Sequence, residues 1–257
     1  MTKDRGTYKK LSLTRRMIGD FLRMSKRVPI AHGERRIVLT ELRAAVAACR
    51  PRPNWVPIFF KAFATVAASR PALRQSYIPY PRPQIFEYPI NLGACVISRQ
   101  IEGDEGLVNL VIPSPEKRSI VELDREIKES RLKPIADVPS FRRQVRLAKL
   151  PWPIRPLAYK LGDWSGKYKV RTMGTFGMSC TASMGLSNIS TWFPWTTMIH
   201  YTPFHDDDSM MLRLGIDHRV FDGLEAAYAL REMEQVLNTS ILEEVRTMAG
   251  ERLKKAA

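Results

Sequence analysis

Asp217-His218-Arg219-Val220-Phe221-Asp222-Gly223 stands near the end of the 257-residue chain and joins two segments of different periodicity. The run before it, residues 210–216, partly alternates apolar and polar side chains and predicts a strand. The run after it, residues 224–237, repeats apolar side chains at helical spacing. We therefore expect His218 at the end of a strand and Asp222 at the start of a helix, where a rigid scaffold presents side chains for chemistry.

His218 is a candidate general base, because an imidazole can take and return a proton near neutral pH. Nothing around it has the Gly-x-Ser-x-Gly spacing of a serine hydrolase, so a covalent hydrolase is not indicated. A purely structural interpretation also fits. Asp222 with Glu225 three residues later matches a capping box, in which Asp222 caps the helix and does no chemistry.

Three blocks of the sequence resemble one enzyme family. The seven residues from Asp217 resemble the active-site signature of the 2-oxoacid dehydrogenase acyltransferases, the dihydrolipoamide acyltransferase cores, and share the shorter His-x-x-x-Asp-Gly with chloramphenicol acetyltransferase. The family's Gly-Thr-Phe-x-Ile-Ser segment is similar to Gly174-Thr175-Phe176-Gly177-Met178-Ser179. Its opening helix and Ser-Lys-x-x-x-Pro-His turn are similar to Leu13-Thr14-Arg15-Arg16-Met17-Ile18 and Ser25-Lys26-Arg27-Val28-Pro29-Ile30-Ala31-His32, where two residues separate Pro from His.

The resemblance spans most of residues 11–238 and implies a fold. That fold is the α/β, chloramphenicol acetyltransferase-like two-layer sandwich, a mixed sheet with helices packed on it. The resemblance also implies a homotrimer in which the catalytic His and Ser come from different chains. Whether trimers build a larger assembly stays open.

Site residues are implied position by position. His218 matches the base that deprotonates the attacking thiol, and Ser179 matches the hydroxyl that stabilises the oxyanion of the tetrahedral intermediate. Asp222 matches the carboxylate that orders the site, with Gly223 beside it in a supporting place. Either Arg15 or Arg16 matches the basic residue that pairs with that carboxylate. Such a site aligns two substrates and needs no covalent enzyme intermediate.

The implied substrates are CoA or acyl-CoA and a thiol or hydroxyl acceptor. The chain shows no lipoyl domain, no peripheral-subunit-binding domain and no Ala/Pro linker, so we expect no covalently bound lipoyl group and a separate carrier, lipoyl protein or other acceptor. Two alternatives remain. One is a non-catalytic trimeric scaffold that retains the fold, and the other is a membrane-associated acyltransferase acting on a lipid or natural product.

The net charge of +15 is the unusual feature of the composition. A basic surface attracts acidic partners such as CoA phosphates, an acidic carrier protein or an anionic membrane. Nucleic acid is the least favoured partner, because no nucleic-acid-binding motif accompanies the charge. Three distant cysteines indicate neither a disulfide framework nor a metal knuckle. No metal is expected, since residues 205–208 (His-Asp-Asp-Asp) read as a hairpin tip.

No signal peptide or membrane span is read, so we expect a cytoplasmic protein or one peripheral on a membrane. Residues 1–10 predict a basic tail, 11–238 the catalytic domain and 239–257 a charged C-terminal helix. Within the domain, the insert 138–172 carries nine Lys or Arg and one acid, Asp163, interleaved with aromatic residues. We favour an insert that packs on a neighbouring subunit or covers the site. The alternative is contact with an anionic membrane or a lipidic substrate.

Local patterns predict further elements. Thr40 is expected to cap a helix through Cys49, and Cys180 to be a core thiol. The expected helices are 11–24, 40–49, 55–69 and 119–131, and the expected strands are 37–39, 92–98 and 107–112, with a turn at 102–106.

Overall fold

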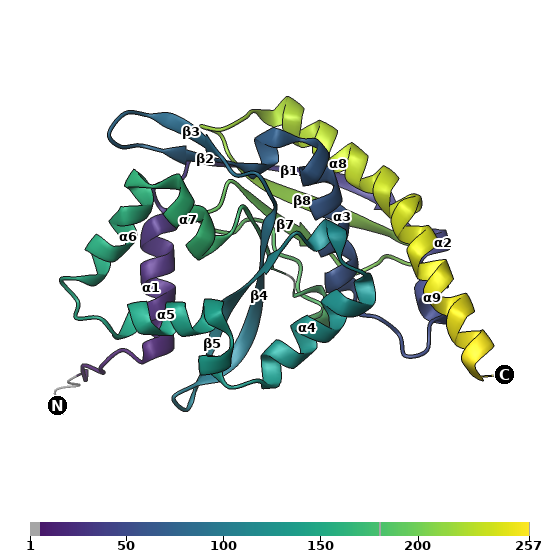
Figure 1. Ribbon diagram of the computed structural model, residues 1–257, viewed down its shortest axis with the longest axis horizontal. Helices are drawn as coiled ribbons and strands as arrows, with labels where there is room; N and C mark the ends of the chain where they lie inside the picture. The colour runs from purple at the N-terminus through teal and green to yellow at the C-terminus, as the bar shows by residue number, and fades with distance from the viewer. Residues whose placement is uncertain (1–5, 180, 257) are drawn as a thin grey trace, which may run out of the picture.

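The computed structural model describes residues 6–179 and 181–256, and the fold is built on a six-stranded mixed sheet (Figure 1). The short central strand β6 runs parallel to both neighbours, whereas the other pairs are antiparallel. This is the predicted fold class. The strands, in their order across the sheet, are β1 (Ile30–Val38), β8 (Ser209–Asp217), β7 (Thr197–Tyr201), β6 (Phe176–Met178), β4 (Leu92–Ile101) and β5 (Asp104–Pro113).

One face of the sheet is covered by the main helical layer. Its central helix, α3, packs Phe60 and Phe63 against Phe176 of β6, with ring centroids 5.3 and 5.0 Å apart. These rings are fully buried, so the predicted core helix 55–69 is confirmed with the same bounds. The helices of this layer are α2 (Thr40–Ala48), α3 (Trp55–Ser69), α4 (Ile120–Leu132), α8 (Gly223–Asn238) and α9 (Ser240–Ala256).

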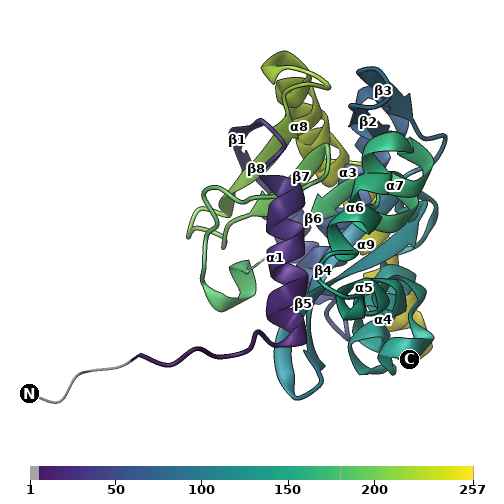
Figure 2. The same cartoon turned by 90° about the vertical axis from the view of Figure 1, so that its left-hand side faces the viewer.

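The opposite face carries helix α1 (Leu13–Ser25), which stands in front of the sheet in Figure 2. Ser12 caps it by accepting a hydrogen bond from the Arg15 N–H. Phe21 of α1 meets Trp195 edge-on at 5.4 Å, and the Trp195 indole donates to the Met173 carbonyl at 2.6 Å. A second, smaller apolar cluster therefore lies between α1 and the sheet.

The insert 138–172 is helical, which the sequence patterns did not predict. It forms α5 (Pro139–Lys149), α6 (Arg155–Trp164) and α7 (Gly166–Met173) beside α1 (Figure 2). A proline lies in the first turn of both α5 and α6, where its missing N–H costs no helical hydrogen bond. A separate hairpin of β2 (Gln75–Ile78) and β3 (Gln84–Glu87) flanks α7, and short 3₁₀ turns are Pro71–Arg74, Pro115–Lys117, Ile135–Asp137 and Ala182–Met184.

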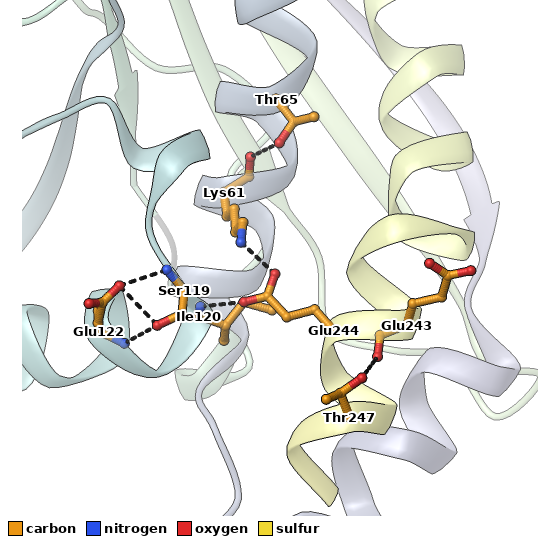
Figure 3. Close-up of polar contacts among 8 residues, drawn as sticks. All are labelled: Lys61, Thr65, Ser119, Ile120, Glu122, Glu243, Glu244 and Thr247. Carbon is orange, nitrogen blue, oxygen red and sulfur yellow. Dashed lines mark hydrogen bonds and ion pairs between the residues drawn. The ribbon is translucent and has the colours of Figure 1, made fainter. Parts of the chain in front are cut away.

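Helix α9, expected as a separate charged segment, belongs to the main core. Ile241, Leu242 and Val245 are buried in the same cluster as α3. Glu244 ties α9 to two other helices, because its carboxylate pairs with Lys61 of α3 and accepts from the backbone N–H of Ile120 at 2.7 Å (Figure 3). The same view shows Ser119 and Glu122 forming a capping box at the start of α4.

Three local predictions were wrong. Leu39 is the N-cap residue of α2, and Thr40 makes no capping bond. Strand β1 begins at Ile30, well before the predicted strand 37–39, because it pairs with β8 along its whole length. Its exposed charged residues hide the alternation of apolar and polar side chains that would have predicted the longer strand. The turn between β4 and β5 holds only Glu102 and Gly103, both at positive φ. None of the described helices combines the length and apolarity needed to cross a bilayer.

Candidate active site

His218 directly follows β8, as the sequence predicted. Its backbone N–H donates to the Pro29 carbonyl at 3.1 Å, which ties the end of β8 to the chain entering β1. Its side chain is exposed and lines a cavity of about 230 Å³ with His32 and Gly223. The imidazole is therefore accessible to a molecule that enters this cavity.

The residues on either side of His218 bind each other. Arg219 donates to both carboxylate oxygens of Asp217, at 2.9 and 2.7 Å, and its guanidinium lies 4.3 Å over the Tyr77 ring. Asp217 is buried, with 1% of its surface exposed. This clamp fixes the backbone that carries His218. The sequence analysis did not predict this ion pair, although a carboxylate two residues before an arginine could have indicated it.

Asp222 begins helix α8, and its Oδ1 accepts from the Leu224 N–H at 3.1 Å. The predicted cap is therefore confirmed. The reciprocal half of the capping box was wrong, because the Glu225 carboxylate pairs with Arg70 at 2.7 Å.

The predicted partners of Asp222 lie elsewhere in the chain. Arg16 donates to the Leu11 carbonyl at 3.3 Å. Arg15 lies near Asp104, whose pKa is lowered mainly by hydrogen bonds from Ser12 and Thr14 and further by the arginine's charge. The start of α1 contacts β5, at the opposite edge of the sheet from β1 and β8. In the described part of this single chain neither arginine pairs with Asp222, so the predicted ion pair stays a prediction for the assembled protein.

Ser179 follows β6 and is held through its backbone. Its N–H donates to the Ile199 carbonyl at 3.3 Å, and its carbonyl accepts from Nδ1 of His200 at 2.8 Å. The other ring nitrogen of His200 lies 2.7 Å from the Thr191 hydroxyl. Burial lowers the pKa of His200 to about 4, so the ring is neutral at pH 7. Because a carbonyl can only accept, Nδ1 carries the proton and Nε2 accepts from Thr191.

His200 is a site residue that sequence reasoning missed. The sequence showed only a histidine within a mostly apolar strand, and that pattern is compatible with many roles. Cys180, next to Ser179, lies outside the described residues.

The segment before Ser179 is shaped by two glycines. Gly174 has φ of +95°, and a Cβ there would lie 2.6 Å from the Leu92 carbonyl oxygen. A Cβ on Gly177 would lie 2.4 Å from the Trp195 ring. Between them, the Thr175 hydroxyl bonds both the N–H and the carbonyl of Leu92. The glycines allow close packing around β6, the central strand at whose end Ser179 lies.

Ser179 and His218 do not line the same cavity in this chain. Ser179 lines one of about 250 Å³ whose other walls include Met17, Phe21 and Trp192. The cavity at His218 is formed by β1 and the start of α8. The two residues that the resemblance assigns to one reaction therefore line different cavities of the single chain.

A larger cavity of about 490 Å³ lies between α1 and the insert helices α6 and α7. Arg219 reaches it from the His218 loop, and Lys169 reaches it from α7. The Lys169 ammonium donates to the Tyr77 carbonyl at 3.0 Å, and burial lowers its pKa to about 8. The insert therefore walls a positively charged cavity beside the loop that carries His218.

The described residues contain no group of three or more His, Cys, Asp and Glu side chains placed to hold a metal ion. In the acidic turn after β7, Asp207 pairs with Arg36 and Asp208 pairs with Arg43. These carboxylates are engaged in holding the hairpin tip to β1 and α2.

Comparison of sequences finds no matching family model and no matching curated protein. Comparison of structures does find relatives. The dihydrolipoamide acetyltransferase of Azotobacter vinelandii superposes with a TM-score of 0.66 at 18% identity, over 93% of this chain and 96% of that one. This is the fold of the dihydrolipoamide acyltransferase cores.

Two further structures agree with that assignment of the acyltransferase fold. A truncated catalytic core of the 2-oxoacid dehydrogenase multienzyme complex from Thermoplasma acidophilum gives a TM-score of 0.67 at 16% identity, over 91% of this chain and 99% of that one. Chloramphenicol acetyltransferase gives 0.53 at 12% identity, over 90% of this chain and all of that one (100%). The fold implied by the three sequence motifs is confirmed.

Proposed function

We propose that the chain is a CoA-dependent acyltransferase, which moves an acyl group between CoA and a thiol or hydroxyl acceptor. The observation that carries the proposal is the place of His218 and Ser179 at the ends of β8 and β6 in an acyltransferase fold. In the Azotobacter enzyme, a serine, a histidine and an asparagine four residues after that histidine were studied for their roles in the catalytic mechanism. Here Asp222 stands four residues after His218.

In the proposed reaction His218 takes the proton of the attacking thiol or hydroxyl. The resulting anion adds to the thioester carbonyl and forms a tetrahedral intermediate, whose oxyanion accepts a hydrogen bond from the Ser179 hydroxyl. When the carbon–sulfur bond to the donor breaks, the leaving thiolate takes the proton back from His218. The step needs no covalent bond to the protein.

The active site in this proposal forms between chains of a trimer. Support comes from the two separate cavities at Ser179 and His218. It also comes from exposed apolar side chains near Ser179, since a neighbouring subunit would cover them. These are Met184, Leu186, Ile189 and Trp192, each more than half exposed. A cyclic trimer would place the His218 of one chain beside the Ser179 of the next.

The first test measures CoA release from acetyl-CoA and longer acyl-CoAs with dihydrolipoamide as acceptor. The His218→Ala variant should lose on the order of a hundredfold or more in kcat. His205→Ala is the matched control, because His205 is exposed on the turn after β7 and away from the cavity at His218. Saturable CoA binding without transfer would indicate a different acceptor. Neither binding nor transfer would overturn the enzyme proposal and leave a non-catalytic scaffold.

The second test asks whether the site is shared between chains. His218→Ala and Ser179→Ala are each expected to be nearly inactive alone. When the two variants are co-expressed, about a quarter of the interfaces in randomly mixed trimers would pair an intact histidine with an intact serine. Activity should return to that level. Mixed trimers with no activity would place both residues in one chain's site and contradict the shared-site proposal.

A further inference from the structure

Helix α6 has its polar side turned inward and an apolar side turned outward. Arg155 is 7% exposed and pairs with Asp20 of α1 at 3.1 Å, so this face of α6 is directed into the protein. Leu157, Leu161 and Trp164 are 63%, 52% and 58% exposed. Their spacing of four and three residues places them on one face of the helix. This reverses the usual amphipathic arrangement, in which the apolar face is buried.

Segments next to α6 carry further exposed apolar side chains. Trp152 and Ile154, in the turn before α6, are also exposed, Trp152 to 70%. Tyr80, from the loop between β2 and β3, stacks on Trp164 with ring centroids 5.4 Å apart. We call this surface the outer apolar patch, which consists of Tyr80, Trp152, Ile154, Leu157, Leu161 and Trp164. Grouped exposed tryptophans on one surface are typical of an interaction site.

The insert helices α5, α6 and α7, one of which carries the outer apolar patch, have an excess of positive charge. Asp163 is the one acid between residues 138 and 172, and it already pairs with Arg27 at 2.7 Å. Lys160 of α6, Lys167 of α7 and Arg146 of α5 are exposed and form no ion pair with any described residue. An occupant of the patch therefore needs an apolar body with negative charge at its edge.

The chemistry that matches is an anionic lipid bilayer. Tryptophan and tyrosine side chains fit the boundary between headgroups and acyl chains, leucines enter the acyl region, and lysines contact the phosphates. A second copy that docked through the same patch fits less well, because the nine Lys or Arg of residues 138–172 on each copy would face one another. We propose that the outer apolar patch docks this protein on an anionic membrane surface, with α6 lying in the plane of the interface.

The helix is already fixed in the orientation that docking requires. The pairs Arg155–Asp20 and Arg27–Asp163 hold it to α1 and to the turn after α1, and α6 lies at the periphery of the molecule, on the left of Figure 1. Docking therefore needs no folding step, and one short helix gives reversible attachment. The proposal does not depend on acyl transfer, because no residue of the outer apolar patch lines the cavities at His218 and Ser179. Tyr80 and Trp164 do line the 490 Å³ cavity between α1 and the insert.

Co-sedimentation of the whole protein with vesicles tests the proposal. Wild type should bind vesicles of phosphatidylcholine mixed with phosphatidylserine, and bind much more weakly to phosphatidylcholine alone. The double change Leu157→Ser with Leu161→Ser should reduce the partition coefficient on the order of tenfold or more. The matched control is Val121→Ser with Leu132→Ser, which removes two exposed apolar side chains from α4. Circular dichroism would check that both proteins are folded.

A charge variant tests whether positive charge contributes to membrane binding. Lys160→Glu should weaken binding to the anionic vesicles several-fold, whereas Arg125→Glu, an exposed cation on α4, should leave it nearly unchanged. Wild type that does not bind anionic vesicles would overturn the proposal. Equal binding by the leucine variant and wild type would also overturn it. If the leucine variant instead dissociates the oligomer in sedimentation velocity, the patch is a subunit interface and the membrane proposal is wrong.

Discussion

Nδ1 of His200 donates a 2.8 Å hydrogen bond to the main-chain carbonyl of Ser179, which joins β7 to the end of β6 beyond the last residue of the strand pairing. The ring's other nitrogen accepts from Thr191, so both are engaged. His200 therefore has no proton to exchange with a substrate, and we assign it a positioning role. It holds the backbone of the residue that we propose as the oxyanion donor.

The buried state of His200 predicts a pH-dependent stability. Its pKa in the folded chain is about 4, below the ordinary value of 6.5, so the unfolded chain binds more protons between these pH values. The free energy of unfolding should fall as the pH drops from about 6.5 to 4, by about 3 kcal/mol from this residue. Urea titrations across this range would measure the slope. His32, whose pKa is also lowered by burial, adds to the same fall.

His200→Asn should flatten this slope, because an amide does not titrate and can still donate to the Ser179 carbonyl. His205→Asn serves as the control, since His205 is exposed. A slope that is the same in His200→Asn and wild type would show that His200 does not titrate in this way.

The clamp between Asp217 and Arg219 predicts a selective loss of activity. Arg219→Lys keeps the positive charge but loses the two-pronged contact and the stacking on Tyr77. We expect kcat to fall on the order of tenfold because the His218 loop is less well fixed. The KM for acyl-CoA and the unfolding midpoint should change little. Arg36→Lys is a matched control, because that arginine pairs with Asp207 at the hairpin tip, at the other end of β8 from the His218 loop. Equal activity of Arg219→Lys and wild type would show that the clamp is dispensable.

Two glycines should respond in opposite directions to an added methyl group. In Gly177→Ala the new Cβ would lie 2.4 Å from the fully packed Trp195 ring, so we expect destabilisation of about 1–3 kcal/mol. In Gly19→Ala, within α1, the Cβ meets no atom within 4 Å, and the gain in helix propensity should stabilise the protein by roughly 0.5–1 kcal/mol. Thermal unfolding of both variants checks the signs. Destabilisation by both would mean that the open space at Gly19 is filled in solution.

The strand before His218 and the helix after Asp222 could be predicted because their periodicity reflects burial on a single face. The capping of α8 by Asp222 was also readable, since a cap depends only on residues within one turn. The position of Arg15 and Arg16 relative to Asp222 within the chain could not be predicted. An ion pair between distant segments depends on tertiary placement, which places those arginines beside β5.

The helices of the insert could not be predicted from the sequence. The insert has prolines at 151, 153 and 156, and Pro156 lies in the first turn of α6, where proline is tolerated. In α6, Leu157, Leu161 and Trp164 face outward and Arg155 faces inward, so the pattern that usually reveals a buried helix face is inverted. Two ion pairs hold α6 in place, one to Asp20 of α1 and one to Arg27 in the turn after α1. Local periodicity does not contain such tertiary contacts.

The buried pair Asp20–Arg155 predicts strong coupling between α1 and α6. The side chains are 2% and 8% exposed, and burial raises the pKa of Asp20 although Arg155 and Arg23 oppose the rise. Asp20→Ala leaves a buried guanidinium without its partner, and we expect a loss of about 3 kcal/mol in the free energy of unfolding. Replacing both residues, with Asp20→Ala and Arg155→Met, should recover most of this loss because no buried charge remains. Urea denaturation of the two single variants and the double variant closes the thermodynamic cycle. Additive losses would show that the two side chains do not interact, and that α6 is held to α1 by packing and by Arg27–Asp163.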